Sequence, residues 1–512
     1  MRMKPTLTAL ALAGLLLAGR AASAQEPPAV PSDPSLTGPP PGAPPNADAP
    51  PAPPAPAPAP VVVPAPAIVV VPPPAPAVVE EPLAGVSNGT MFLRSPDNMF
   101  QFFPNGRLQS DLYFFKSDAP TGAVPHNSFF IKRARLELAG WVDQIVYFQV
   151  GAEFASVAAP AASNYVATDN FVAIAPYKDL AILQVGQFDA PFTLENRTSD
   201  KYFDFIERSL TVRAFGIPTN KEMGAMLHGT NDERNFYYSA GFFNGDGQNF
   251  KNVDNSFDFM ARGWISPTSF LGEGPLHDIT LGGSYWTGNR SLANAFANQT
   301  TAGGFKILDA GLPKIGMDNT GLFQQGRHHT YAFEVNAPVM HKYGVRWEFV
   351  HKDQPLSAFD TTTAAAPTQP TLEAGLHLKG WSQYFEAWAW VMGDDRIVGE
   401  PGMQMPTRYK KFGVKAPQHG LMLAARLEML DETLSADDPT GAGAPLTKAN
   451  SYGKTKLTSY TLGANYWISK RFRTMFNWTL NHFDGDTPYV TTGTLKNAKN
   501  EQEFSFRLAI AL

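Results

Sequence analysis

The sequence predicts an all-β fold: a 16-stranded antiparallel transmembrane β-barrel, preceded by a signal peptide and a Pro/Ala-rich disordered segment. Three observations lead to this prediction. The first residues have the layout of an export signal, alternating apolar and polar residues fill most of the chain, and the final segment keeps one apolar face up to Leu512. Aromatic residues reach 12% and charged residues only 17%, which suits a protein with lipid-facing strands.

Residues 1–24 form the predicted signal peptide. Arg2 and Lys4 precede a largely apolar run over residues 7–17, and Ala22-Ser23-Ala24 supplies the small residues of a cleavage site. The run is too short to span a bilayer, which takes about 20 apolar residues. We therefore expect export and cleavage after Ala24, with an ordinary N-terminal helix as the alternative.

Residues 25–82 form a Pro-rich linker that holds 23 of the 45 prolines. Proline lacks a backbone donor and favours polyproline II, so this segment predicts neither helix nor sheet. At about 3.1 Å per residue, it could extend over roughly 180 Å. One interpretation is a disordered spacer; the other is a periplasmic arm that contacts the cell wall.

Residues 83–512 are the predicted barrel, in which short segments of period-2 alternation are separated by Gly, Pro, Asn and Asp. Phe504, Phe506 and Leu508, for example, alternate with Ser505 and Arg507. A soluble sandwich has the same periodicity with the faces reversed, but the export signal and the aromatic faces favour a barrel. The expected strands are 100–115, 129–141, 145–154, 168–176, 180–188, 221–229, 235–244, 256–266, 276–288, 328–338, 343–352, 378–392, 420–431, 456–467, 473–484 and 501–512.

An even number of strands places both ends of the barrel on the periplasmic side. Most connections then sort by length, with short turns at 142–144, 177–179 and 469–471 and long loops at 189–220, 289–327 and 432–455. The connection 393–419 is the exception, because it is long and lies on the turn side.

Composition and motifs exclude several classes of function. The chain has no cysteine, so thiol catalysis, zinc–thiolate sites and disulfides are ruled out, and a net charge of −5 does not indicate a nucleic-acid partner. We find no G-x-S-x-G, H-E-x-x-H or P-loop motif, and expect no enzyme, no cofactor and no metal site. His328 and His329 should point to opposite faces of one strand, and Asp484-Gly485-Asp486 fits a turn better than a calcium site.

Several short segments, in order and at sensible spacing, carry a family resemblance. They are GRLQSD (106–111), KRARLELAG (132–140), GQFDAPF (186–192) with FIERS (205–209), FFNGDG (242–247), AARLEMLD (424–431) and LGANYW (462–467). Together they resemble the phosphate-selective porin O and P family over roughly residues 100–512. Departures are Met422-Leu423 where the family often has Trp-Glu, Leu512 where it usually ends in Phe, and the segment Asn220–Gly224, which lacks an expected arginine.

The resemblance implies a trimeric outer-membrane porin, a passive diffusion channel for small hydrophilic solutes, with anions such as phosphate as the expected solutes. Two alternatives remain: a general non-selective pore, and a barrel that anchors the outer membrane to the cell wall through the Pro-rich arm. Besides small anions, the expected partners are outer-membrane lipid and two further copies of the chain.

In this family, selectivity comes from basic side chains in the lumen and on the inward loop, because guanidinium groups match phosphate oxygens. Residues 83–512 hold 38 Lys and Arg against 41 Asp and Glu, so pairing with carboxylates inside the barrel is the alternative role for each candidate. The pore-lining or anion-binding candidates are Arg107, Arg133, Arg135, Arg197, Lys201, Arg208, Arg213, Lys221, Arg262, Arg346 and Arg426.

The loop 189–220 is the expected constriction. It is long, and it contains Phe192, Phe203, Phe205 and Phe215, which are too apolar for a solvated loop tip. Packing these side chains against the barrel wall would fold the loop inward. Packing at the rim or at a trimer axis is the alternative.

Deleting residues 25–82 while keeping the signal peptide should leave channel formation intact, because the segment has no core-forming pattern and precedes the first strand. The variant should insert into membranes, migrate as a heat-modifiable trimer and conduct ions in a planar bilayer. Loss of insertion in this variant, with the full-length chain as control, would contradict the prediction.

Overall fold

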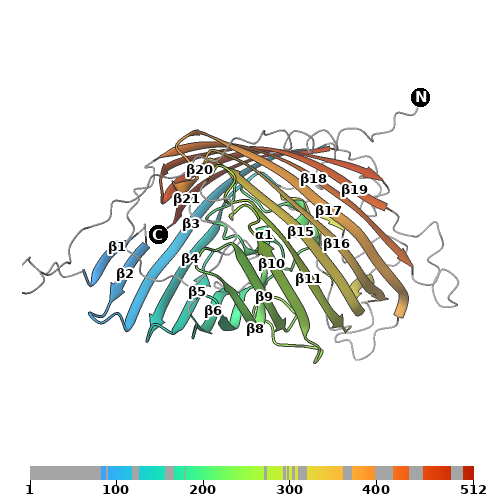
Figure 1. Ribbon diagram of the computed structural model, residues 1–512. Helices are drawn as coiled ribbons and strands as arrows, with labels where there is room; N and C mark the ends of the chain where they lie inside the picture. Colours follow the sequence, from blue (N-terminus) through green and yellow to red (C-terminus); the bar gives the residue numbers. More distant parts are fainter. Residues whose placement is uncertain are drawn as a thin grey trace, which may run out of the picture. The chain divides into compact units, whose positions relative to one another are not determined.

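The computed structural model contains a closed barrel of sixteen antiparallel strands, as the alternation predicts (Figure 1). The structure describes residues 82–87, 90–117, 126–155, 166–177, 179–269, 274–291, 296, 299–302, 306–308, 320–360, 372–397, 419–436, 454–485 and 500–511. The predicted signal peptide and nearly all of the Pro-rich linker lie outside these residues. No helix among them is long and apolar enough to cross a membrane.

Each barrel strand pairs with its neighbours in the chain, and the last strand pairs with the first to close the ring. The closing register joins Phe506 to Leu112 and Arg507 to Asp111. The barrel strands are β3 (Phe100–Ser117), β4 (Ser128–Val142), β5 (Val146–Glu153), β6 (Val166–Ile174), β7 (Ile182–Asp189), β8 (Lys221–Thr230), β9 (Phe236–Phe243), β10 (Asp258–Ile265), β11 (Thr280–Arg290), β15 (Gly326–Val339), β16 (Tyr343–Asp360), β17 (Leu372–Met392), β18 (Gly420–Ala436), β19 (Lys454–Ser469), β20 (Phe472–Gly485) and β21 (Asn500–Ala511).

The two faces of the barrel have the inverted polarity of a membrane protein. Leu108, Leu462 and Leu508 are about half exposed on the outer face, whereas Arg107, Thr461 and Arg507 are buried on the inner face of the same strands. Apolar side chains thus face lipid and polar side chains face the lumen. This distribution settles the choice between a barrel and a soluble sandwich that periodicity alone left open.

Two additions to the ring were not expected from the sequence. A hairpin of β1 (Ala84–Ser87) and β2 (Thr90–Arg94) joins β3, where Leu93 and Arg94 pair with Phe102 and Gln101. β14 (Thr320–Gln324) pairs with the last residues of β16, from Leu356 to Asp360. β15 pairs with the earlier part of the same strand, so β14 continues the edge that β15 forms along β16. Gln325 lies between β14 and β15. Gly326, the first residue of β15, has a φ of 81°, a conformation that glycine adopts without strain. A short pair, β12 (Gln299–Thr300) with β13 (Lys306–Leu308), forms a separate sheet.

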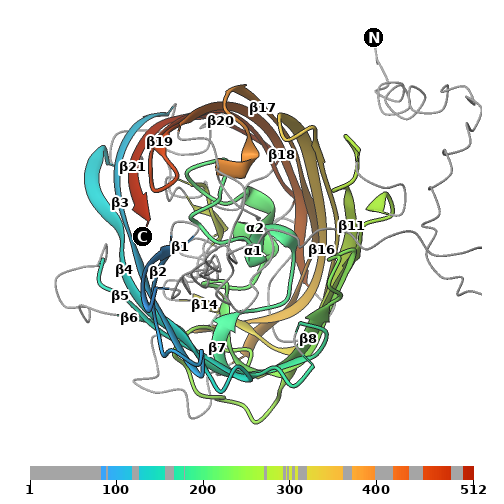
Figure 2. The same cartoon turned by 60° about the vertical axis from the view of Figure 1, so that its left-hand side comes forward.

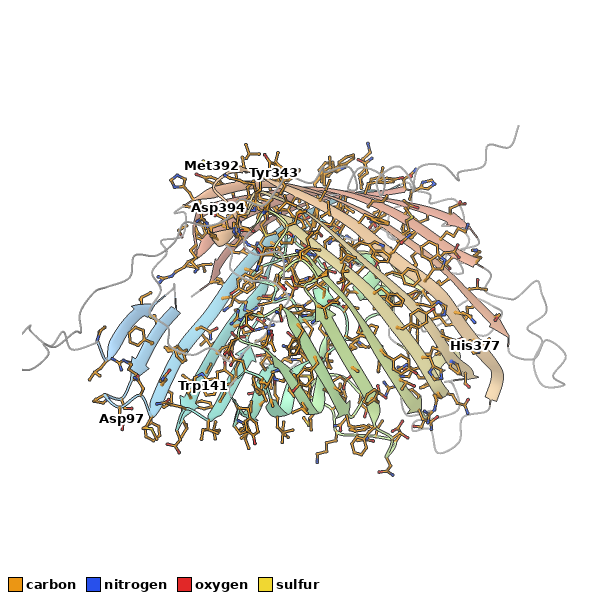
Figure 3. The ribbon with its side chains drawn as sticks, in the orientation of Figure 1. Asp97, Trp141, Tyr343, His377, Met392 and Asp394 are labelled. Carbon is orange, nitrogen blue, oxygen red and sulfur yellow. The ribbon has the colours of Figure 1, made fainter. Side chains whose placement is uncertain are left out.

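Short turns join the strands at one end of the barrel, here called the turn end, and longer connections join them at the other, here called the loop end. The turn-end connection after β17 is long, as the sequence indicates, and begins with a 3₁₀ turn, η2 (Asp395–Ile397). Residues 398–418 of this connection lie outside the described residues. Figure 3 shows Met392 at the turn end of β17 and His377 toward its loop end.

The strands differ greatly in length around the ring. β5 to β10 have 8 to 10 residues, whereas β16, β17 and β18 have 18, 21 and 17. We refer to β15–β20 as the long wall and to β5–β10 as the short wall. At about 3.4 Å per residue, β17 is roughly 70 Å long and exceeds what a bilayer core requires. The long wall therefore extends past the hydrocarbon region at the loop end.

Leu462→Arg should destabilise the folded barrel by about 2–4 kcal/mol, because Leu462 lies on the lipid-facing side in the middle of β19. The same change at Thr433, near the loop end of β18, should cost about 0–1 kcal/mol. Reversible folding into lipid vesicles across a urea series measures both. Equal effects at the two positions would contradict the assignment of the outer face to lipid.

Candidate functional site: the inward loop and the lumen wall

The connection between β7 and β8, residues 190–220, lies inside the ring of strands (Figure 2). It contains two short helices, α1 (Leu194–Arg197) and α2 (Leu210–Phe215). Each begins after a hydroxyl residue whose side chain accepts a backbone N–H of the first turn: Thr193 from Asn196, and Ser209 from Val212. These caps fix where the loop turns.

Apolar packing holds one side of this inward loop against the lumen wall. Phe192, Leu210 and Phe215 are buried in one cluster with inner-face residues of β7–β20, whose side chains are apolar at this level of the barrel. Burying one such side chain contributes roughly 1.5–3 kcal/mol. The inward folding expected from these residues is confirmed. The cluster members on the wall are Phe188, Met226, Phe243, Met260, Trp286, Ala332, Val350, Leu430, Leu457 and Phe483.

Two glutamates of the long wall accept backbone N–H groups at the starts of the two loop helices. Glu348 on β16 accepts from the backbone N–H of Leu194 and, at 3.2 Å, from that of Glu195. Glu428 on β18 accepts from the N–H of Leu210. The first N–H groups of a helix have no partner within the helix, so an acceptor on the wall satisfies them and sets the position of the loop.

The acidic side chains of the loop pair with basic groups on the wall. Asp200 contacts Arg107 and, at 2.5 Å, Arg133, both on β3–β4. The other pairs are Asp204 with Arg346 at 2.9 Å, Glu207 with Lys132 at 2.5 Å, and Glu195 with Arg426 at 3.4 Å. Arg107, Asp200, Glu195 and Arg426 are buried, so loss of one partner in their pairs leaves an uncompensated charge. The pairs of Asp204 and Glu207 are partly exposed.

The remaining wall candidates pair with carboxylates of the wall itself. Arg135 lies 3.2 Å from Glu153, and Arg262 lies 2.6 Å from Glu334. Lys221, at the start of β8, bridges Asp169 and Asp189 at 2.6 Å each. Every predicted wall candidate therefore lies inside the barrel and pairs with a carboxylate. Such pairing is the alternative role that the charge balance of the sequence left open for these residues.

The four basic residues of the loop differ from the wall residues in their partners. Arg197 is 2% exposed and donates to the carbonyl oxygen of Asp189. Lys201 donates to Asn105 Oδ1 at 3.1 Å and lies 4.0 Å from Glu137. Arg197 is thus packed within the protein, whereas Lys201 is partly exposed.

Arg208 and Arg213 are also partly exposed, and both donate only to carbonyl oxygens. Arg208 donates to Glu195 O and Thr198 O at 3.4 Å and lies over the Phe203 ring at 4.5 Å. Arg213 donates to Arg208 O at 2.9 Å and to Thr300 O at 2.7 Å. Within the described part of the chain, no carboxylate lies at ion-pair distance from either guanidinium, so their charges are not neutralised by direct contact.

Three basic wall residues that contact the loop were not among the candidates. Arg473 donates to Phe203 O at 2.8 Å and Asp200 O at 3.2 Å, and stacks over Trp467. Arg507 pairs with Asp111 at 2.7 Å and donates to Ile206 O at 2.8 Å. The third is Lys132, the partner of Glu207. Arg473 and Arg507 alternate with apolar residues along their strands. The criterion that selected Arg426, a basic residue on the polar face of an alternating segment, therefore also applies to them.

The loop also meets the long connection at the turn end. Ile397 of η2 is fully buried with Phe205 of the loop and with Trp388, Trp390 and Trp467 of the wall. The lumen is therefore narrowed by segments from both ends.

Among the described residues, no group of three or more His, Asp or Glu has the arrangement of a metal site. His328 is buried and His329 lies on the opposite face of the strand, as the alternation predicts.

Comparison with known proteins shows which family this chain resembles. Residues 104–304 match the model of the phosphate-selective porin O and P family. Over this region, which is less than half of its length, the chain is similar to that family. The match includes the inward loop but ends before the later segments, 424–431 and 462–467, that also carry the resemblance. The protein is an outer-membrane porin, a channel whose lumen is narrowed by residues 190–220.

Solved structures of similar shape include outer-membrane expressed OmpT of Vibrio cholerae (11% identity, TM-score 0.47, covering 82% of this chain and 100% of that chain). Others are the outer membrane channel DcaP of Acinetobacter baumannii (9%, 0.45, 82% and 99%) and an anion-selective porin from Comamonas acidovorans (10%, 0.42, 81% and 100%). Among curated proteins, none matches the sequence significantly.

Replacing Glu348 and Glu428 together by Ala should raise single-channel conductance, because the loop helices lose their wall acceptors. Each lost hydrogen bond to a charged group should cost about 1.5–3 kcal/mol of loop docking. Conductance in a planar bilayer is the measurement. Glu334→Ala is the matched control, since Glu334 is equally buried but pairs with Arg262 on the wall. An equal rise in the control, or no rise in the double variant, would show that these contacts do not hold the constriction.

Proposed function

We propose that this porin is a passive channel for small hydrophilic solutes with a preference for anions such as phosphate. The observation that carries the proposal is the pair Arg208 and Arg213, which are partly exposed and lack a carboxylate partner among the described residues. A guanidinium fork binds phosphate oxygens through two parallel hydrogen bonds. In a narrow lumen with low-dielectric walls, two such charges dominate the local potential.

The other basic candidates have smaller parts in this proposal. Arg107, Arg133, Arg346 and Arg426 hold the acidic side chains of the loop, so they act on selectivity through the position of the loop. Lys201 contributes as a partly exposed cation beside Glu137. Arg197 is packed away from solvent and acts as a structural residue. Transport of this kind needs no catalytic residue, cofactor or metal, and we propose none.

We propose that the porin assembles as a homotrimer through the short wall. The outer face of this wall carries exposed aliphatic side chains such as Val150, Val185 and Leu227, whereas that of the long wall carries rings such as Tyr331 and Phe333. Aromatic side chains mark surfaces that meet the membrane interface, so a sector dominated by aliphatic residues suits contact with another copy. A heat-sensitive trimer band on a mild gel tests this assembly.

The orientation follows from strand number and from the position of the N-terminal hairpin. We propose that the signal peptide (residues 1–24) is removed and that the turn end faces the periplasm. The backbone N–H of Arg94 donates to Leu83 O at 2.8 Å, so the described chain begins beside the turn end of β3. The Pro-rich arm would then start in the periplasm, where contact with the cell wall is its proposed second role.

Replacing Arg208 and Arg213 together by Gln should lower the anion-over-cation permeability ratio toward unity, because the two unneutralised charges in the lumen are removed. Reversal potentials in a planar bilayer under a salt gradient, with and without phosphate as a competitor, measure the effect. Conductance itself should change little.

The control removes the same charge from the outer face of the barrel, at Lys116 and Arg327, and should leave the reversal potential unchanged. If the lumen variant also keeps its reversal potential, the channel is a general pore. If the purified protein conducts no ions, the anchoring role through the Pro-rich arm is favoured.

A further inference from the structure

The outer face of the long wall carries a band of charged side chains near the loop end. We define this charged belt as Asp353 on β16, His377 and Lys379 on β17, Asp431 on β18, and Lys454 and Lys456 on β19. The sheet register places the members side by side, since Asp353 pairs with Lys379 and Asp431 pairs with Lys456. The groups that border the belt on the same face are Arg327, His329, His351 and Asp484.

Aromatic side chains lie on the same face, next to the belt on the side toward the membrane centre. Trp381 is paired with both His351 and Asp431, and its ring stacks with Phe349 at 6.4 Å. Tyr331 contacts His351 at 4.9 Å between ring centroids. Aromatic girdles of barrels lie at the boundary between hydrocarbon and head groups. The belt therefore lies at the depth of the lipid head groups of the leaflet at the loop end.

Each carboxylate of the belt is shared by two cations. Asp431 lies 3.0 Å from Lys454 and 3.7 Å from Lys456. Asp353 contacts His377 and lies 3.4 Å from Lys379. The lysine side chains are 46–62% exposed, whereas those of the two aspartates are 19–30% exposed. A group that approaches from the lipid side meets ammonium groups first, and each ammonium has three donors.

We propose that Lys379, Lys454 and Lys456 bind the phosphate groups of lipid head groups in the outer leaflet. Phosphate is the anionic group that lipid head groups present at this depth, and basic clusters beside a membrane span bind such groups. The inference rests on the proposed orientation, with the loop end outside, and is independent of what permeates the pore. The partner of the long wall is thus a phosphorylated lipid, whereas the short wall is left for contact between copies.

The test uses the full-length porin in vesicles of phosphatidylcholine with and without phosphatidic acid, which carries a phosphate monoester. Lipids retained by the extracted protein are counted by native mass spectrometry. The wild type should retain phosphatidic acid in preference to phosphatidylcholine. Each lysine near a membrane surface contributes roughly fivefold to affinity, so the variant K379Q/K454Q/K456Q should lose about 100-fold.

The control variant K342Q/K470Q/R471Q removes the same charge from turn-end positions and should bind like the wild type. The variant K379R/K454R/K456R keeps the charge and should also bind, which separates lost binding from misfolding. No preference for phosphatidic acid in the wild type, or full retention by the glutamine variant, would overturn the proposal. Loss of the trimer with unchanged lipid retention would instead assign the belt to contact between copies, which also overturns it.

The outcome is distinguishable from a failure of the proposed channel function. The glutamine variant of the belt should keep the wild-type reversal potential, because its changes lie on the outer face. The Arg208 and Arg213 variant, in turn, should keep its lipid retention.

Discussion

The geometry of the lumen depends on how the inward loop is held to the wall by reciprocal polar contacts. On the long wall, Glu348 and Glu428 accept backbone N–H groups from the starts of α1 and α2. On the side of β3 and β4, the loop provides the carboxylate and the wall provides the cations, because Arg107 and Arg133 of the wall pair with Asp200 of the loop. A carboxylate on one side and guanidinium groups on the other fix the loop across the barrel. Phe192 and Phe215 add apolar packing against the inner face of the wall.

This arrangement makes the two halves of the lumen chemically different. Apolar packing of α2 against the wall closes part of the cross-section to water. Apart from Pro218, Thr219 and Asn220 at its end, the loop residues that retain some exposure are Ser199, Lys201, Tyr202, Asp204, Glu207, Arg208 and Arg213, and all seven are polar or charged. Water and solutes therefore meet the polar side of the loop. In the proposed function, selectivity depends on the few charges on that side that have no carboxylate partner among the described residues.

Much of the fold could be predicted from the sequence, because alternation is strong wherever one face meets lipid and the other meets water. All sixteen barrel strands overlap the expected segments, and the inward loop was found from its excess of aromatic residues. The strand segments that the sequence did not predict are those with little or no alternation. β1 and β2 have four and five residues, too few to show a period. β17 begins six residues earlier than expected, because the outer face is polar there while Leu376 and Leu378 face inward.

The sequence predicted which basic residues lie on the inner face, but it predicted less well what each of them does there. Alternation placed Arg107, Arg346 and Arg426 correctly on the inner face, but it carries no information about partners distant in sequence. The pairing of Arg346 with Asp204 spans 142 residues, and that of Arg426 with Glu195 spans 231. Which loop arginines stay unneutralised depends on these pairs, so the sequence could not separate Arg208 and Arg213 from Arg197.

The reciprocal pairing of wall and loop changes how a charge substitution acts on this pore. Arg346 contacts both Asp204 of the loop and Glu386 of the wall. Removing its charge would therefore leave two carboxylates without their common partner, one of them on a segment that is then less firmly held. The potential in the lumen would shift by more than the single charge removed, and the width of the pore would shift with it. In the proposed function, ion selectivity and pore size are thus coupled, because Arg346 contributes charge to the lumen and also holds the loop.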